Sequence, residues 1–277
     1  MSLRLFDSHC HLNLPELAPQ MDAHWQAAQA VGVAALLIPA VEQAAWQPLL
    51  QLRQQQPDWQ PLLQLRQQQP DWQIALGIHP WWAAQHSLQV VTELETMLRE
   101  QQDAICAIGE IGLDFALAPE TFSMQQQLFE AQLALAARLN KPVILHHRKS
   151  QPHLLAAIKR ENFADGGILH AFSGSPEQGQ AFIDCGFKLG IGGTISYERA
   201  AKTRRAVEQL PLSAFVLETD APAMPLAGFQ GQTNTPAQLA LVFQHFCQLR
   251  PEPPEQLAEA LWHNTQQVLR LDPTSAG

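Results

Sequence analysis

The chain has 277 residues, of which 46% are hydrophobic, so it can bury a large core. Its formal net charge of −9 and pI near 5.6 argue against broad electrostatic attraction to nucleic acid, although bound cations could offset that charge at one site. No stretch approaches the ~18 apolar residues of a membrane span. The sequence has no Gly/Ser/Pro-rich linker and no CxxC pair, and because no basic region followed by an apolar run stands near residue 1, a signal peptide is not expected. These features predict one cytoplasmic domain over residues 1–277, with no membrane association and no obligate protein partner.

Eight short apolar runs alternate with amphipathic segments along the chain. Continuous apolar runs are typical of parallel strands covered on both faces. The expected strands are Arg4–His9, Ala34–Pro39, Ile74–Ile78, Ala104–Gly109, Val143–His146, Gly167–His170, Phe187–Ile191 and Phe215–Thr219. This alternation predicts an α/β fold, a single-domain (β/α)8 TIM barrel. A doubly wound open sheet is the alternative, but no Gly-rich dinucleotide loop follows the first strand.

Helical spacing of apolar residues marks the segments between the strands. Asn140 is expected to end one helix, and Pro176 to stand in the first turn of another. The spacing is clearest at Met21, Trp25 and Ala28, at Phe129, Leu133 and Ala136, and at Leu239, Val242, Phe243 and Phe246.

A 13-residue tandem duplication spans residues 48–73, where Pro48–Gln60 is repeated identically as Pro61–Gln73. A solenoid would need at least about three repeats, so this fold is not expected to be one. Pro57 and Pro61 oppose one continuous helix through both copies. We expect one copy to form an outer helix of the barrel and the other to be an added helix or loop at its periphery.

The first strand leads into Phe6-Asp7-Ser8-His9-Cys10-His11. Because side chains alternate along a strand, His9 and His11 are expected on one face and Cys10 on the other. Two adjacent imidazoles can form half of a divalent-metal site. For this motif alone, two solvated histidines are the simpler interpretation.

Four further candidate ligands stand at the carboxyl ends of expected strands: Glu110, His146, His170 and Asp220. In a parallel barrel these ends share one rim, so residues distant in sequence meet there. With His9 and His11, they would supply four histidines and two carboxylates for two divalent ions. Imidazole ligands favour zinc, whereas magnesium or manganese could also support the chemistry.

The motifs FDSHCHL, GEIGLD, ILHHRKS, LHAFSGS and LETDAP, between Phe6 and about Asn264, resemble the signatures of the TatD family of metal-dependent hydrolases. The resemblance implies hydrolysis of phosphodiester bonds in DNA. It also implies that Asp220 orients and deprotonates the water activated by two metals, with Glu110 bridging them. The first metal would be held by His9, His11, Glu110 and Asp220, and the second by Glu110, His146 and His170.

Two residues depart from the family pattern. Phe115 stands where a tyrosine is common, and His147 where a serine is common; both changes bear on substrate preference and leave the ligands intact. Asp7 and Glu218, near the ligands, could orient the histidines. Asp114 could do the same, with a helix-cap or loop role as an equal alternative.

Three rim residues are candidate substrate contacts. His79 could contact a phosphate or water, and Arg148 could clamp a phosphate, although a salt bridge at the rim is an equal alternative. Ser173 could donate to a phosphate, or its loop could simply cap the next helix. Trp81 and Trp82 could stack on a base, although loop packing is the simpler interpretation.

The leading hypothesis is therefore a two-metal deoxyribonuclease acting on DNA ends or single strands. A metal-dependent hydrolase of a small ester, lactone or amide is the alternative, because fold and metals alone do not determine the reaction. A non-catalytic metal-binding barrel ranks last, since structural zinc sites are usually closed by about four ligands and six candidates exist here.

Overall fold

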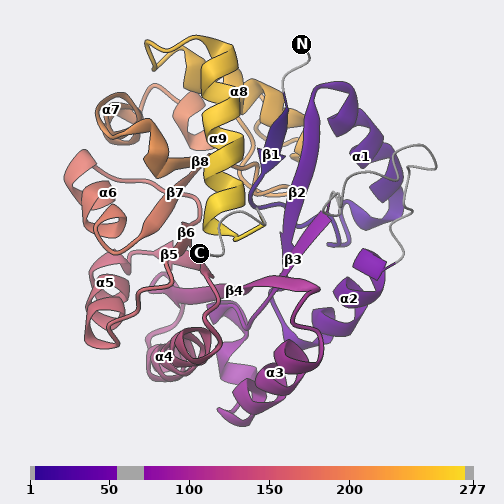
Figure 1. Cartoon of the computed structure of the whole chain (residues 1–277), viewed down its shortest axis with the longest axis vertical. Helices are drawn as coiled ribbons and strands as arrows, with labels where there is room; N and C mark the ends of the chain where they lie inside the picture. The colour runs from indigo at the N-terminus through magenta and orange to yellow at the C-terminus, as the bar shows by residue number, and fades with distance from the viewer. Residues whose placement is uncertain (1–3, 55–71, 272–277) are drawn as a thin grey trace.

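The computed structural model describes residues 4–54 and 72–271. Its strands form one eight-stranded sheet in the order β1 to β8, and all neighbours pair in parallel. The amide of Ser8 donates to the carbonyl of Leu217 (2.8 Å), which joins the last strand to the first. The strands are β1 (Leu5–Asp7), β2 (Val33–Pro39), β3 (Trp72–Leu76), β4 (Ile105–Asp114), β5 (Val143–Arg148), β6 (Gly167–Leu169), β7 (Phe187–Ile191) and β8 (Phe215–Leu217). The predicted (β/α)8 TIM barrel is confirmed (Figure 1).

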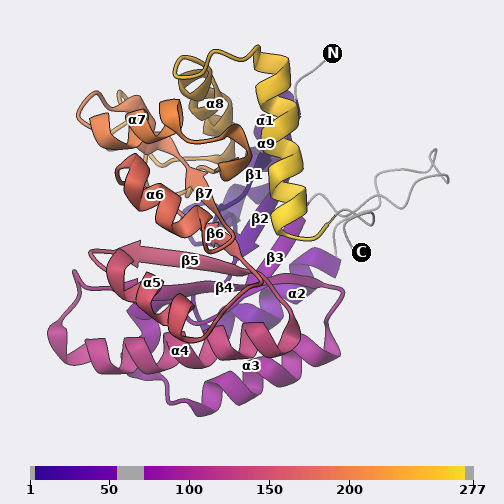
Figure 2. The same cartoon turned by 60° about the vertical axis from the view of Figure 1, so that its left-hand side comes forward.

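Helices cover the outside of the barrel (Figure 2). They are α1 (Met21–Ala30), α2 (Trp46–Gln54), α3 (Gln89–Glu100), α4 (Phe122–Leu139), α5 (Gln151–Arg160), α6 (Pro176–Ile183), α7 (Ala201–Gln209), α8 (Leu239–Cys247) and α9 (Pro254–Val268). As expected, Asn140 ends α4 in the left-handed conformation (φ 50°), and Pro176 opens α6 behind a capping box made by Ser175 and Gln178. No helix within residues 4–54 and 72–271 is long and apolar enough to cross a bilayer.

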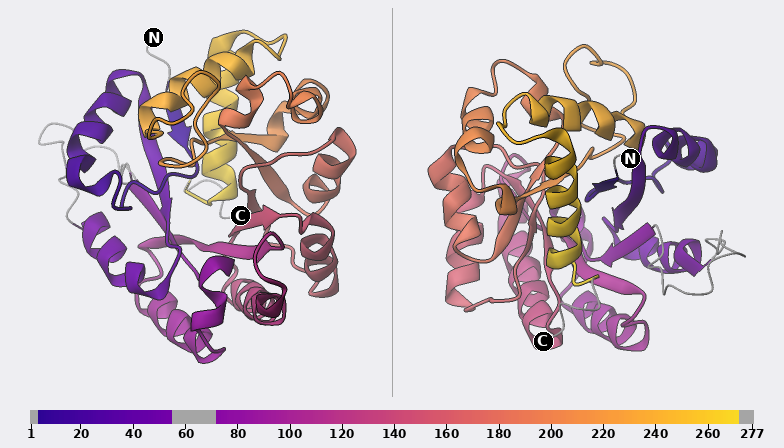
Figure 3. Two further views of the ribbon diagram at one scale, coloured as in Figure 1. Left: turned by 180° about the vertical axis from the view of Figure 1, so that it is seen from behind. Right: turned by 45° about the horizontal axis from the view of Figure 1, so that its top comes forward.

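Two apolar clusters hold the barrel together. The larger one lies between the strands and the outer helices. The smaller one fills the barrel and includes the end of α9; its members are Phe6, Ala35, Leu37, Ala75, Ala107, Ile144, Ile168, Val216, Val268, Leu269 and Leu271. Helix α9 lies in front of the strands in Figure 1 and behind them from the opposite side (Figure 3, left). Hydrophobic packing therefore closes one end of the barrel and leaves the other for polar chemistry.

Strand β4 differs most from its prediction. The apolar run ends at Gly109, but the strand continues to Asp114, so Glu110 lies within it and not after it. The pairing with β5 shifts register between Ile108 and Ile111, next to Glu110. The reason is tertiary: pairing with β5 extends the strand through residues whose local pattern resembles a turn.

The duplicated segment contributes to two elements. Residues 48–54 of the first copy lie in α2, where Leu49 and Leu50 are buried against the barrel, as expected for an outer helix. Residues 55–71 are outside the described part of the chain, so the placement of the rest of the duplication stays a prediction. Trp72 and Gln73, the last residues of the second copy, begin β3 and so enter the barrel wall, which was not expected.

Candidate metal centre

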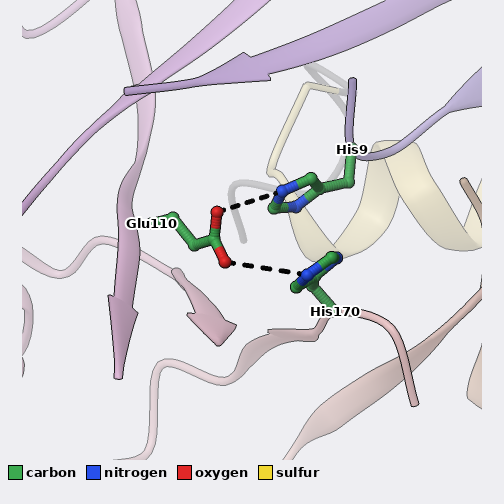
Figure 4. A group of neighbouring side chains, drawn as sticks. All are labelled: His9, Glu110 and His170. Carbon is green, nitrogen blue, oxygen red and sulfur yellow. Dashed lines mark ion pairs between the residues drawn. The ribbon is translucent and has the colours of Figure 1, made fainter. Parts of the chain in front are cut away.

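Glu110 is the point on which the predicted ligands converge. Figure 4 shows its carboxylate facing His9, which follows β1, and His170, which follows β6. Its Oε2 lies 3.2 Å from Nε2 of His9 and 3.5 Å from Nε2 of His11. Its Oε1 lies 3.0 Å from Nδ1 of His146 and 3.6 Å from Nε2 of His170. Each carboxylate oxygen thus faces a different pair of the histidines predicted as ligands.

The N-terminal pair faces a second carboxylate. The Nε2 atoms of His9 and His11 are 3.1 Å apart, and each lies 3.7 Å from Oδ1 of Asp220. Cys10 is fully buried and packs in the cluster between the strands and the helices. The predicted alternation along this segment is therefore confirmed, and it directs both imidazoles to one point.

Hydrogen bonds at the far nitrogens indicate which ring atoms are available. Nδ1 of His11 lies 3.2 Å from the carbonyl of Pro39, and Nδ1 of His170 lies 3.2 Å from Oε1 of Glu218. Both partners are acceptors, so each Nδ1 carries a hydrogen. When these imidazoles are neutral, Nε2 presents a lone pair to the cluster, which is the form that binds a metal.

His79 has the opposite tautomer. Its Nδ1 accepts a hydrogen bond from the backbone N–H of Trp81 (3.1 Å), and burial lowers its pKa to about 4. The neutral ring must therefore carry its hydrogen on Nε2, 3.5 Å from Oε1 of Glu110. Proximity alone groups His79 with Glu110 and His146 as a possible metal site. Its tautomer instead makes it a hydrogen-bond donor into the cluster.

Glu218 supports His170 from the barrel wall. Besides the imidazole, its Oε1 accepts from the backbone N–H of Ala171 (2.6 Å). A Cβ on Gly190 would stand 2.1 Å from Oε2 of Glu218, so this carboxylate occupies space that only glycine leaves open. The expected role of Glu218 in orienting a histidine therefore has a geometric basis.

The other two supporting carboxylates differ from each other. Oδ2 of Asp114 lies 3.4 Å from Nε2 of His146, which turns Nδ1 of that ring toward Glu110. Within the described part of the chain, no hydrogen bond or ion pair joins Asp7 to an imidazole. Its carboxylate accepts from the backbone N–H of His9 (3.3 Å) and from the N–H and hydroxyl of Thr219 (2.9 and 2.6 Å). Asp7 therefore holds His9 through its backbone, and its side chain joins the ends of β1 and β8.

Charges in this buried cluster strongly affect one another. Burial acts to raise the pKa of Glu110, but the imidazoles of His79 and His9 hold it well below its usual range. Burial acts to lower the pKa of His170, but Asp220 and other carboxylates raise it to about 10. Burial raises the pKa of Asp220 to about 6. When no metal ion is bound, protons on the imidazoles therefore offset the negative charge of the carboxylates.

The donor set fits divalent cations. Two three-residue groups, one of His9, Glu110 and His170 and another of His9, His11 and Asp220, have ligand atoms all within 4.8 Å of one another. Nitrogen and carboxylate oxygen are the ligands of zinc and related metals. Among the described residues, no Lys or Arg forms an ion pair with either carboxylate, so cationic charge is left to protons or metal ions.

The remaining predicted contacts lie at the rim. Arg148 is exposed and forms no ion pair with a described residue, so the alternative of a salt bridge is not seen. Ser173 is also exposed, and its carbonyl accepts from Nε2 of Gln151 (3.1 Å). Burial lowers the pKa of His147 to about 3, and its Nδ1 lies 3.4 Å from Nε2 of Gln151, as expected for a packed residue.

Comparison with known proteins identifies the family. The relative YjjV of Escherichia coli (strain K12), an uncharacterized metal-dependent hydrolase, is 41% identical over 271 residues, which cover 98% of this chain and 100% of YjjV. A crystal structure of YjjV, described as a TatD homolog, matches with a TM-score of 0.88 at 40% identity, covering 99% of this chain and 100% of that one. The 3'-5' ssDNA/RNA exonuclease TatD of Edwardsiella piscicida is 34% identical over 201 residues, 70% of this chain and 76% of the relative. Residues 6–270 match the family described as TatD related DNase. The chain therefore belongs to the TatD family of metal-dependent hydrolases.

Proposed function

We propose that this protein is a two-metal phosphodiesterase that cleaves DNA at ends or in single strands. The observation that carries the proposal is the position of Glu110, whose two oxygens face different histidine pairs. A carboxylate so placed can bridge two cations. When bound, the cations would lower the pKa of a water molecule and offset the negative charge that develops on the phosphate.

The chain's own residues divide into two groups of ligands. His9, His11 and Asp220 would share Oε2 of Glu110, because their donor atoms lie on that side. His146 and His170 would share Oε1. Zinc fits the histidine content best, with magnesium or manganese as the other candidates.

Asp220 is the proposed proton acceptor. Its Oδ1 faces His9 and His11, and its pKa of about 6 in the absence of metal keeps it ionised near neutral pH yet able to accept a proton. We infer that it orients the attacking water and takes its proton as the oxygen attacks phosphorus. The P–O bond to one sugar oxygen breaks in the same displacement, and that oxygen leaves as a hydroxyl after it takes up a proton from solvent.

Three features support a phosphate substrate. The neutral His79 directs an N–H into the cluster and can donate to a non-bridging phosphate oxygen. Arg148 is free of carboxylates within the described structure and can form two parallel hydrogen bonds with a phosphate. Ser173 adds an exposed hydroxyl at the same rim. A relative named for ssDNA/RNA exonuclease activity supports nucleic acid as the phosphodiester.

We place the reaction in the cytoplasm, because the four cysteines are free thiols.

The test combines metal analysis with a choice of substrates. Purified protein should contain about two equivalents of divalent metal, and it should release nucleotides from single-stranded DNA only when metal is present. Model p-nitrophenyl esters and lactones run in parallel. Cleavage of these compounds without any cleavage of DNA would overturn the proposal and assign the protein to small-molecule hydrolysis.

A further inference from the structure

Trp81 is a large apolar side chain that is exposed to solvent beside the candidate metal centre. It lies in the short 3-10 helix Pro80–Gln85 after β3, and 58% of its surface is exposed. It is the most exposed large hydrophobic side chain in the described part of the chain. Its neighbour Trp82 is partly buried and packs against the core, so loop packing explains Trp82 but not Trp81.

Hydrogen bonds hold the indole in a defined orientation. Its Nε1 donates to Oδ2 of Asp114 (3.0 Å), and its backbone N–H donates to Nδ1 of His79 (3.1 Å). Its ring centroid lies 4.7 Å from that of His79 and 6.4 Å from that of His146, with the planes crossed at 74° and 67°. Neither imidazole stacks on the indole, so the ring is fixed at one edge and still open to a partner.

We propose that Trp81 is the stacking platform for the nucleobase next to the scissile phosphate. This inference rests on the proposed function, because it needs a substrate whose phosphate lies at the metal centre. A ring seated on this indole would adjoin His79, the proposed phosphate donor, and a nucleobase is joined to its phosphate through one sugar. A preorganised aromatic face also needs little reordering on binding, which favours stacking.

The same arrangement indicates that a base would be recognised by its flat face and not by the polar groups on its edge. Asp114 accepts from the indole through Oδ2 and from the backbone N–H of Ala116 through Oδ1 (2.9 Å), and its side chain is fully buried, so it is not exposed to a base edge. Stacking without edge contacts accepts any base. We therefore expect Trp81 to promote binding of all four bases and not to select one.

Binding measurements test the stacking role of Trp81 separately from the hydrolysis of DNA. In metal-loaded protein, a deoxynucleoside monophosphate should bind about 10- to 100-fold more tightly than deoxyribose 5-phosphate, which has no base. Trp81→Ala and Trp81→Leu should lose this difference, because leucine retains apolar volume without a flat ring. Trp81→Phe should keep part of it. Leu88→Ala, which removes another exposed apolar side chain after β3, is the matched control and should keep all of it.

The outcomes distinguish this inference from the proposed function. An unchanged base preference in Trp81→Leu, or no preference in the wild-type protein, would overturn the platform even if DNA is hydrolysed. Loss of metal from Trp81→Leu would also overturn it, because Trp81 would then act only by supporting Asp114 and His79. Cleavage of single-stranded DNA by the same wild-type preparation is scored separately and decides the proposed function.

Discussion

The two ends of the barrel use the same strands for opposite purposes. At the closed end, Phe6 contacts Trp262 (ring centroids 5.5 Å apart), and the last turn of α9 packs into the interior with Val268 and Leu269. At the open end, Glu110, His9 and His170 are equally buried, but their side chains are ionisable. Apolar burial stabilises the first end directly, whereas the second buries charged groups that must be neutralised.

Ion pairs follow the same division. Those between arginine and carboxylate lie near the C-terminal ends of helices, as for Arg99 with Glu95 in α3 and Arg270 with Asp165 after α9. At the open end, Arg148 has no such partner among the described residues. The interior apolar cluster and the candidate metal centre thus lie at opposite ends of the barrel, so we expect that each can be changed without the other.

The largest effect is expected at the open end. Asp220→Asn should lower kcat about 10²–10⁴-fold, because the amide cannot accept the proton. Circular dichroism and thermal unfolding should remain close to wild type. Asp165→Asn is the matched control: it removes a carboxylate of the closed end and should leave kcat unchanged. Near-wild-type turnover by Asp220→Asn would refute the assigned role.

The reverse effect is expected at the closed end. Phe6→Ala should lower the free energy of unfolding by about 3–5 kcal/mol, because it leaves a cavity in the barrel interior. Denaturant unfolding measures the loss. Below the unfolding transition, metal content and kcat should be near wild type. A metal deficit in the folded variant would contradict the separation of the two ends.

Gly190→Ala should weaken metal binding with a smaller effect on the fold. The added Cβ would displace Glu218 and so free His170, and loss of such support typically lowers metal affinity about 10–100-fold. Titration with zinc against a chelating indicator measures the affinity. At Gly192 the nearest atom to an added Cβ is 3.4 Å away, an ordinary contact, so Gly192→Ala should bind zinc as the wild type does.

The affinity for metal should change gradually with pH, and this is the smallest of the expected effects. In the metal-free site the pKa of His170 is about 10, so its imidazole is protonated at neutral pH and must lose that proton to bind a metal. The apparent affinity should therefore rise up to about tenfold per pH unit for each proton released, from pH 7 to 9. Below pH 6, protonation of Asp220 should weaken binding further.

Calorimetry in buffers of different ionisation enthalpy counts the released protons. Glu218→Gln removes a carboxylate that raises the pKa of His170, so it should release fewer protons at pH 8. An affinity that stays flat above pH 7 would mean that His170 is neutral before the metal binds.

Local patterns predicted most of the fold. The run Phe187–Ile191 matches β7 residue for residue, and Asn140 ends its helix as expected. These features depend on apolar periodicity and on the few residues that adopt left-handed geometry, both of which are local. The end of β4 was missed because pairing with β5, over 30 residues away, decides it.

The sequence by itself determined the types of the candidate ligands, the strands that carry them and the shared direction of His9 and His11, because side-chain alternation along a strand depends only on neighbouring residues. Only the tertiary structure decided that each oxygen of Glu110 faces a different histidine pair. It likewise decided that Asp7 joins β1 to β8 and that Nε2 of His79 lies 3.5 Å from Oε1 of Glu110. These outcomes depend on distances across the closed barrel, between residues up to 212 positions apart, and no local pattern encodes them.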